Sequence, residues 1–198
     1  METIIAATGN KDKIKEIDAI TRALGIKVVS KSEVGLGDFD PVEDGNTFEE
    51  NSYIKAYEIM KRCNKPTIAD DSGLEVEYLD GAPGTYSGRF AGEEENYQRN
   101  NEKLLSLLEG VPYHDRRAKF VTVITLIYPD GKTIVARGEC PGHIIIEPNG
   151  EGGFGYDPLF IPEGYQRTFA QLGTDVKNQI SHRARALKEL AIKLEEDK

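Results

Sequence analysis

Apolar residues near the N-terminus follow first a strand pattern and then a helix pattern. The short run Thr3–Thr8 is ended by Gly9-Asn10, which is typical of a buried strand. Helical spacing then relates Ile14, Ile17, Ile20 and Leu24. Gly25 is a helix stop signal, and residues 26–30 form a second apolar run. The order strand, helix, strand predicts an α/β fold with parallel strands.

A second helix is predicted after an acidic loop over residues 31–46. Thr47 and Glu50 have the spacing of a capping box, which starts a helix. The inner face of this helix is predicted to hold Ser52, Ala56, Ile59 and Cys63. Asn51 and Lys55 share a different face of the same helix.

Further strands are predicted over residues 67–69 and 74–78, on either side of Asp70-Asp71-Ser72-Gly73. A loop over 80–92 leads to a helix over 93–108, with Tyr97, Leu104 and Leu108 facing inward.

The C-terminal half predicts a hairpin followed by a loop and a last helix. Strands over 118–128 and 133–140 are joined by Pro129-Asp130-Gly131. A Gly-rich loop over 147–157, a short strand over 159–161 and a helix over 181–195 follow. Because there is no internal repeat or linker, we expect one mixed α/β domain over residues 1–198.

Composition narrows the class of protein. The net charge is −9, from 25 basic and 34 acidic residues, which argues against non-specific binding of nucleic acid. Cys63 and Cys140 show no CxxC or Cys/His pattern, so a zinc site is not expected. There is neither a signal-peptide pattern nor an apolar run of membrane-spanning length. We expect a cytoplasmic protein with reduced thiols and no membrane partner.

The segment Thr8-Gly9-Asn10-Lys11-Asp12-Lys13 connects the first strand to the first helix. Backbone N–H groups at a helix start attract anions, and a lysine in the first turn reaches a phosphate. The segment lacks the GxxxxGK[ST] pattern of a P-loop. It is therefore either a phosphate-binding turn or a plain connection with solvated lysines.

Asp70 and Asp71 follow the short strand over residues 67–69, where we expect the sheet to open into a loop. Successive strand residues point to opposite faces, so the two acids are expected to have different roles. One could bind Mg²⁺ or Mn²⁺ or activate a water, with Glu43 as a second ligand. The alternative is a turn in which Asp and Ser cap backbone groups.

Gly150, Gly152 and Gly155 spell GxGxxG, the pattern of a dinucleotide site. Pro158 and a predicted strand follow, whereas that pattern must open a helix, so we reject a Rossmann site. Glycines around Phe154 and Tyr156 instead suggest a backbone close to a flat ligand, with an aromatic face for stacking. The alternative is a tight turn whose aromatic rings belong to the core.

Ser181 is a predicted N-cap that places His182 and Arg183 in the first turn of the last helix, after Lys177. Both His and Arg donate hydrogen bonds that suit carbonyl oxygens. The alternative is a solvated helix start. A Ser72, His182 and Asp71 triad is discounted because no Gly-x-Ser-x-Gly pattern surrounds Ser72.

Taken in order, several motifs resemble one family. They are TGNxxK from Thr8, FxEN from Phe48 with Lys55 after it, ADDSG from Ala69, GGFGYDPxF from Gly152, and Ser181-His182-Arg183. Together they resemble the inosine triphosphate pyrophosphatase family, which hydrolyses non-standard purine nucleoside triphosphates such as ITP, dITP and XTP. The similarity spans the chain from Thr8 to Arg183.

The resemblance implies an α/β fold with an elongated central mixed β-sheet flanked by helices, two lobes with a cleft, and a homodimer. It implies that Thr8, Gly9, Asn10 and Lys13 bind the triphosphate with Lys55, and Lys11 and Asp12 complete that segment. Asp71 would be the general base and a Mg²⁺ ligand, Glu43 and Asp70 further metal-site acids, and Ser72 a substrate contact. Around the base and sugar it places Phe154, Gly155, Tyr156, Asp157, Lys177, His182 and Arg183.

Two competing functions remain open at this point. One is a related pyrophosphatase that acts on pyrimidine or modified nucleotides, against which the loop from Phe154 to Asp157 and the Ser-His-Arg segment argue. The other is a nucleotide sensor without catalysis, which needs the same contacts but no activated water. The presence of Asp71 and of further acids favours the enzyme.

Overall fold

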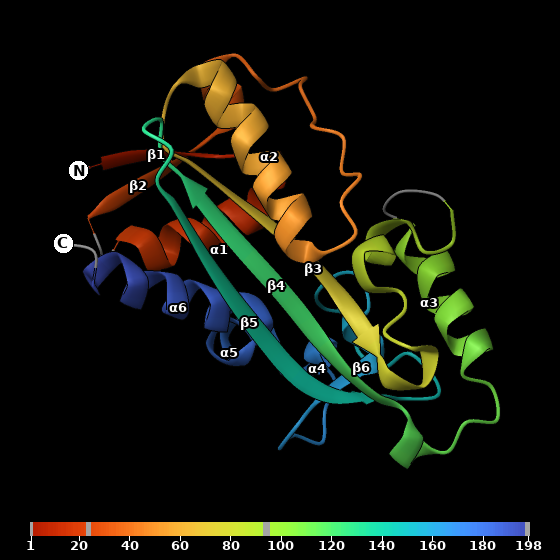
Figure 1. Ribbon diagram of the computed structural model, residues 1–198. Coiled ribbons are helices and arrows are strands. Elements are labelled where there is room, and N and C mark those ends of the chain that lie inside the picture. The colour runs from red at the N-terminus through yellow and green to blue at the C-terminus, as the bar shows by residue number, and fades with distance from the viewer. Residues whose placement is uncertain (1, 23–24, 93–95, 197–198) are drawn as a thin grey trace. The chain divides into compact units, whose positions relative to one another are not determined.

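The computed structural model describes residues 2–22, 25–92 and 96–196. The strands are β1 Glu2–Ala6, β2 Ile26–Ser30, β3 Thr67–Val76, β4 Arg117–Ile127, β5 Thr133–Ile144 and β6 Phe160–Pro162. The helices are α1 Lys11–Thr21, α2 Phe48–Cys63, α3 Tyr97–Leu107, α4 Phe169–Leu172, α5 Thr174–Ile180 and α6 His182–Glu196. Figure 1 shows these elements along the chain.

The strands form one six-stranded sheet in the order β2-β1-β3-β4-β5-β6. β1 pairs in parallel with β2 and β3, and β5 pairs antiparallel with β6. The predicted mixed α/β sheet is therefore confirmed. The hairpin is confirmed as well: the N–H of Tyr128 donates to the carbonyl of Lys132, and Gly131 has φ of 91°.

The chain divides into two compact units. The first contains Met1–Asp71, Thr122–Gly138 and Arg183–Lys198, and the second contains Ser72–Val121 and Glu139–His182. Strands β3, β4 and β5 each contribute residues to both units. The division falls directly after Asp71, so the Asp-Asp-Ser-Gly segment is shared.

The first unit has a sheet with a hydrophobic core on each face, because successive residues of β1 point in opposite directions. Ile4 packs in a core with Ile17 of α1 and Leu187 of α6. Ile5 packs in the other core with Ala56 and Ile59 of α2. Figure 1 shows α2 on one face of these strands and α1 and α6 on the other. This layering is that of an α/β fold.

The helix signals of the first unit are confirmed where the structure describes them. The Thr47 side chain accepts the N–H of Glu50, and the Glu50 carboxylate accepts the N–H of Thr47, so the capping box starts α2. Gly25 has φ of 75° after α1, as a stop glycine does. The side chain of Ile20, and Leu24, lie outside the described part of the chain.

The second unit has one core, which contains Leu74 of β3, Leu104 of α3, and an aromatic group formed by Phe120, Phe160 and Phe169. Tyr97 was expected to face inward, but it lies in the first turn of α3 and is 37% exposed. Helices α4 and α5 were not predicted, and the short strand over 159–161 is observed as β6, one residue later. Within the described residues, no helix is long and apolar enough to cross a membrane.

Gly142→Ala is expected to destabilise the second unit, because a Cβ atom at Gly142 would lie 2.2 Å from the carbonyl oxygen of Ile161 and 2.6 Å from the Phe160 ring. Overpacking of this kind costs about 3 kcal/mol. The urea midpoint should fall accordingly. Gly88→Ala is the control, since an added Cβ there meets no atom within 4 Å. An unchanged midpoint for the Gly142 variant would contradict the packing described.

Candidate active site

Asp70 and Asp71 lie in the middle of β3, not in a loop. The prediction that the strand opens after Ala69 is wrong, because β3 continues without a break from Thr67 to Val76. Both acids are buried, at 3% and 7% exposed. As predicted from strand geometry, they have different partners, and each partner set comes from helices on one face of the sheet.

Asp71 faces α2, which supplies its counter-charge. The Nζ atom of Lys55 lies 3.2 Å from Oδ1 of Asp71 and 3.1 Å from Oε2 of Glu43. Lys55 therefore lies between two carboxylates that were predicted from the sequence to be metal ligands. The structure brings Lys55, Asp71 and Glu43 together, although Glu43 comes from the loop before α2.

The charge state of this group is set by burial and by its neighbours. Burial raises the pKa of Asp71, Lys55 opposes this, and the like charge of Glu43 adds to the rise. Burial alone would lower the pKa of Lys55, but Asp71 and Glu43 outweigh it and raise that pKa. Oδ2 of Asp71 is buried and has no hydrogen-bond partner among the described residues. Asp71 is thus a carboxylate with increased affinity for a proton and an unused oxygen.

Asp70 faces α1 and α6. Its Oδ2 atom lies 3.0 Å from Nζ of Lys13 and 3.5 Å from Nη2 of Arg183, and Arg183 also contacts Glu16 at 2.6 Å. Burial would raise the pKa of Asp70, but the charges of Lys13 and Arg183 outweigh it and hold that pKa far below its usual range. The structure does not bring Asp70 to the pair formed by Glu43 and Asp71.

The segment before α1 has the hydrogen bonds of a helix start. The side chain of Asn10 accepts the N–H of Lys13 at 3.1 Å, and Oγ1 of Thr8 accepts the N–H of Asn10 at 3.1 Å. Gly9 and Lys11 are exposed. The side chain of Asp12 lies outside the described residues. Lys13 is held at the first turn of α1 by Asp70, so it stands beside the N–H groups of the helix start.

A divalent cation would have oxygen ligands in the first unit. Within the described residues, no group of three or more His, Cys, Asp or Glu side chains is close enough to hold a metal ion by itself. Mg²⁺ usually binds through one or two carboxylates, with water and substrate phosphate as its other ligands. The unused buried oxygen of Asp71, beside the carboxylate of Glu43, fits that pattern.

The aromatic loop, residues 152–157, is organised by a buried ion pair in the second unit. Nζ of Lys177 lies 2.5 Å from Oδ2 of Asp157, which also accepts the N–H of Phe154 at 3.0 Å. The same ammonium lies 4.1 Å from the centre of the Phe154 ring. Gly153 has φ of 75°, and a Cβ there would lie 2.2 Å from Oδ2 of Asp157. Lys177 thus orders this loop and leaves the Phe154 ring half-buried.

The remaining residues of the loop divide between core and backbone roles. Tyr156 is 4% exposed, packs in the core of the second unit and donates its hydroxyl to the carbonyl of Ser87 at 2.8 Å. Its burial raises the pKa of the phenol. The carbonyl of Gly155 accepts the side-chain amide of Asn101 at 3.1 Å. Tyr156 is therefore a core residue, which was one of the two alternatives for this loop. Stacking on a flat ligand stays a prediction for Phe154.

The Ser181-His182-Arg183 segment sends its side chains to different surroundings. Ser181 has the extended backbone of an N-cap, and α6 begins at His182 as predicted. The His182 ring, 5% exposed, stacks on Phe120 with 4.8 Å between ring centres. Arg183 is bound to Glu16 and Asp70. Ser72 is half-buried in β3. The interpretation of a solvated helix start is therefore wrong, because both side chains are buried.

Sequence reasoning missed the residues that connect these groups. Glu16 was placed on no site, although it lies one turn after Lys13 in α1. Asn51 was noted on the same helix face as Lys55 but received no role. Ser87 and Asn101 carry no motif that distinguishes them from other polar residues. Asn51 and Glu16 had a usable signal, because each lies one helical turn from a lysine and side chains at that spacing share their surroundings.

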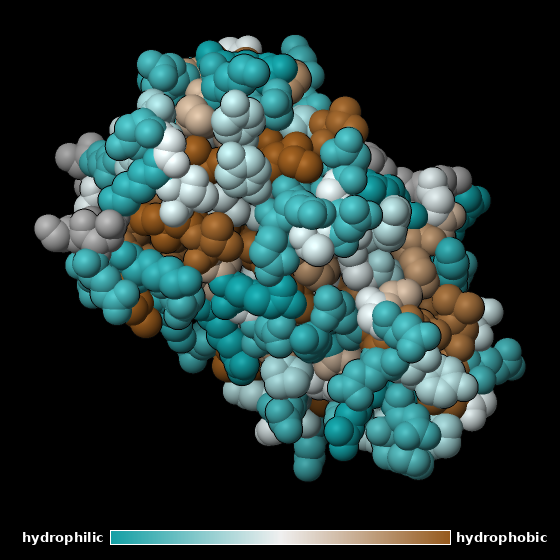
Figure 2. Space-filling model, in the orientation of Figure 1, coloured by the Kyte–Doolittle hydropathy of each residue, from teal (hydrophilic) through white to brown (hydrophobic). Residues whose placement is uncertain are grey.

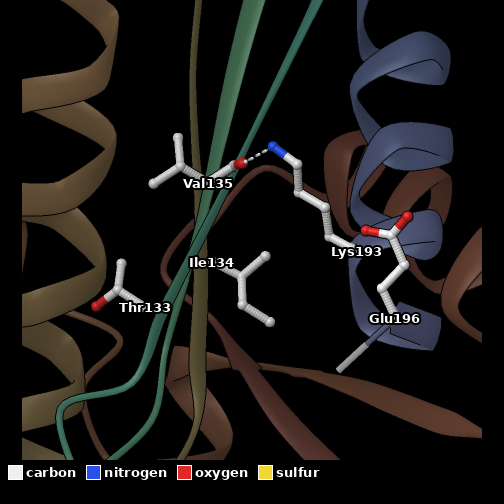
Figure 3. A pocket seen from close by; sticks show the side chains of 5 residues that line it. All are labelled: Thr133, Ile134, Val135, Lys193 and Glu196. Carbon is white, nitrogen blue, oxygen red and sulfur yellow. Dashed lines mark hydrogen bonds between the residues drawn. The ribbon is translucent and has the colours of Figure 1, made fainter. Parts of the chain in front are cut away.

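A surface pocket on the first unit lies away from these groups. It is lined by Thr133, Ile134, Val135, Lys193 and Glu196, and Nζ of Lys193 donates to the carbonyl of Val135 at 2.8 Å (Figure 3). None of these residues belongs to the groups above. The face drawn in Figure 2 is mostly hydrophilic, with hydrophobic residues in small separate patches.

The sequence matches the model of the Ham1 family over residues 4–193. The chain belongs to this family. The resemblance inferred from the motifs is therefore confirmed. This Ham1-family chain carries the Lys55, Asp71 and Glu43 group on an α/β scaffold that its relatives share.

Named relatives match over nearly their whole length. A dITP/XTP pyrophosphatase of Desulforamulus reducens is 50% identical over 185 residues, covering 93% of this chain and 92% of the relative. A dITP/XTP pyrophosphatase of Bacillus subtilis is 45% identical over 195 residues, covering 98% of each. The solved Ham1 protein of Staphylococcus aureus has a TM-score of 0.91 at 44% identity, with 100% of both chains covered.

Proposed function

We propose that this chain hydrolyses non-standard purine nucleoside triphosphates, namely ITP, dITP and XTP, to the monophosphate and pyrophosphate, and so clears them from the nucleotide pool. The observation that carries the proposal is Asp71: a buried carboxylate of raised pKa with an unused oxygen, beside Lys55 and Glu43. The relatives named dITP/XTP pyrophosphatase support the choice of substrate.

In this proposal the first unit performs the phosphate chemistry. Asp71 accepts a proton from a water whose oxygen attacks the α-phosphorus, and pyrophosphate leaves. Lys55 and Lys13 bring positive charge to the triphosphate, and the helix start that follows Thr8, Gly9 and Asn10 adds the positive end of the α1 dipole. Asp70 holds Lys13 in place rather than accepting the proton, because its pKa is far below the usual range.

Glu43 and Asp71 would hold the divalent cation, which we propose to be Mg²⁺, with Mn²⁺ as a substitute. When bound, such an ion neutralises the negative charge that grows on phosphate oxygens during the attack. Lys55 opposes the effect of burial on Asp71 and so favours the ionised form of that carboxylate.

For the base we propose contacts from Phe154, Lys177, His182 and Arg183, with Ser72 as a further substrate contact. A 6-keto oxygen accepts a hydrogen bond, whereas the 6-amino group of adenine donates one. Donors such as His182 and Arg183 therefore favour hypoxanthine and xanthine over adenine. Tyr156, Asp157 and Gly155 act indirectly, because their contacts hold the loop that carries Phe154.

The test is pyrophosphate release with Mg²⁺, comparing ITP, dITP and XTP with ATP, GTP and UTP. We expect the first three to be hydrolysed at least about tenfold faster than ATP, as the misplaced 6-amino donor of adenine in a buried site costs more than about 1 kcal/mol. The co-product should be the nucleoside monophosphate. Orthophosphate as the product would mean that a different phosphorus is attacked. ITP that binds without turnover would favour a sensor.

We also propose that the protein works in the cytoplasm as a homodimer. Within the described residues no disulfide joins Cys63 and Cys140, which is usual in a reducing compartment. The dimer is supported by the family resemblance alone. Light scattering on the purified chain tests it, since a monomer mass would contradict it.

A further inference from the structure

Asn51 links the two segments that carry Glu43 and Asp71. It lies in α2 and is 1% exposed, and its side-chain oxygen accepts the N–H of Gly45 at 2.9 Å. Hydrogen bonding by the Asn51 amide also acts on Asp71, where it lowers the pKa of the carboxyl and so opposes the larger effect of burial. One amide thus touches the loop just after Glu43 and the carboxylate that the proposed reaction uses as its base.

Asn51 lies so close to Gly45 that a residue with a side chain at position 45 would clash with it. A Cβ atom at Gly45 would lie 2.7 Å from Oδ1 of Asn51 and 2.7 Å from Cβ of Glu50. The next N–H, that of Asn46, donates to the Glu50 carboxylate at 2.6 Å. The C-terminal end of the Glu43 strap, which we define as residues 39–45, is therefore fixed against the first turn of α2.

The other end of the Glu43 strap is fixed by separate contacts. Lys31 is 2% exposed, and its ammonium donates to the carbonyl of Phe39 at 2.6 Å and pairs with the carboxylate of Asp40. The guanidinium of Arg62 lies 3.7 Å from the centre of the Phe39 ring. Between these anchors Val42 is 77% exposed, whereas Pro41 and Glu43 are half-buried. The position of Glu43 therefore depends on the two ends of the strap and on the ion pair with Lys55.

The side chain of Asn51 is not needed to build α2. The capping box of Thr47 and Glu50 already starts the helix, and the backbone N–H of Asn51 donates to the carbonyl of Thr47. A buried amide costs free energy unless its groups find partners, and here those partners are Gly45 and Asp71. The side chain of Asn51 therefore acts on the segments that carry the two carboxylates and does not support the start of α2.

We propose that Asn51 is a positioning residue that sets the separation of the Glu43 and Asp71 carboxylates and thereby the affinity of the first unit for a divalent cation. The inference rests on the proposed function for the roles of those carboxylates. Mg²⁺ and Mn²⁺ demand closely defined ligand geometry, and loss of a partner that orients a ligand typically weakens metal binding by about 10–100-fold. The carboxylates of Glu43 and Asp71 also repel each other, so they move apart unless neighbouring groups fix their positions.

The test compares Asn51→Ala, Asn51→Asp and the control Asn46→Ala, which removes an exposed amide from the same region. Mn²⁺ alone is titrated into the full chain and followed by electron paramagnetic resonance. Hydrogen exchange of the Gly45 amide is measured by NMR. We expect Asn51→Ala to raise the Kd for Mn²⁺ by about 10–100-fold and to speed Gly45 exchange. The control should change neither.

Asn51→Asp separates the two contacts of the amide. It retains an oxygen that accepts the Gly45 N–H, so exchange at Gly45 should stay slow. It loses the N–H donor toward Asp71, so ITP turnover should fall by about tenfold or more. If this variant kept wild-type turnover, the contact with Asp71 would have no positioning role.

Thermal unfolding shows whether each variant is folded. A folded Asn51→Ala variant that binds Mn²⁺ as tightly as the wild type would overturn the proposal. If the wild type hydrolyses no nucleotide while the Mn²⁺ and exchange results are as expected, the proposed function fails and the positioning role stands. The two failures are therefore distinguishable.

Discussion

Asp71→Asn is expected to lower ITP hydrolysis by about 10³-fold or more, measured as pyrophosphate release at saturating Mg²⁺. The amide cannot accept a proton from water, and general-base catalysis alone contributes about 10²–10⁴-fold. It also removes a negative ligand beside Glu43, which weakens the proposed cation site. Lys55 keeps its ion pair with Glu43, so the positive charge that we propose binds the triphosphate remains in place.

The same substitution is expected to leave the stability of the fold unchanged or slightly higher. Burial raises the pKa of Asp71, so its charged form is costly in the folded protein, and a neutral amide removes that cost. Lys55 retains Glu43 as its partner. Unchanged turnover by a folded Asp71→Asn variant would contradict the assignment of Asp71 as the base.

Asp70→Asn is expected to destabilise the protein by about 3 kcal/mol, although it makes the same chemical change one residue earlier. Removing one partner of a buried ion pair leaves the other charge uncompensated, which costs about 3–5 kcal/mol. Arg183 keeps Glu16, so we expect the lower end of that range. The urea midpoint at pH 7 measures the loss. Asp38→Asn, at an exposed position, is the control.

The difference between Asp70→Asn and the wild type should shrink in acid. The folded pKa of Asp70 lies below the unfolded value of 3.8, so its contribution to stability is complete well above pH 3.8. As the pH falls below that value, the unfolded chain takes up a proton first, and the wild type loses about 1.4 kcal/mol per pH unit. A difference that stayed constant from pH 7 to pH 3 would contradict the lowered pKa of Asp70.

Much of the scaffold could be predicted because its signals are local. The capping box at Thr47, the stop at Gly25 and the hairpin at Gly131 each depend on a few neighbouring residues. The core of the first unit follows from periodicity, since Ile4 and Ile5 had to face opposite sides of a strand. For the same reason the different partners of Asp70 and Asp71 were foreseen.

The continuation of β3 through Asp70 and Asp71 could not be predicted. Asp, Ser and Gly favour turns, and only partners that are distant in sequence make a buried strand position tolerable for an acid. Lys13, Lys55 and Arg183 provide those partners from three different helices. Short helices such as α4 also lack a full hydrophobic period, so pattern alone does not reveal them.

For the second unit, the sequence indicated which residues belong to the candidate site but not what each residue does there. Lys177 and Asp157 were both named, but nothing in the sequence indicates that they form an ion pair under the Phe154 ring. Tyr156 looked like a stacking surface, and its contact with Ser87 is visible only once the chain is folded.

Because one unbroken strand carries both acids, β3 can tolerate changes of side chain far better than changes of length. Deleting a single residue between Thr67 and Asp70 would turn every following side chain to the opposite face. Asp71 would then meet the cations of α1 and α6, and Lys55 would face a position without the proposed base. Insertions and deletions in this stretch are therefore excluded by geometry, even where the sheet itself could still form.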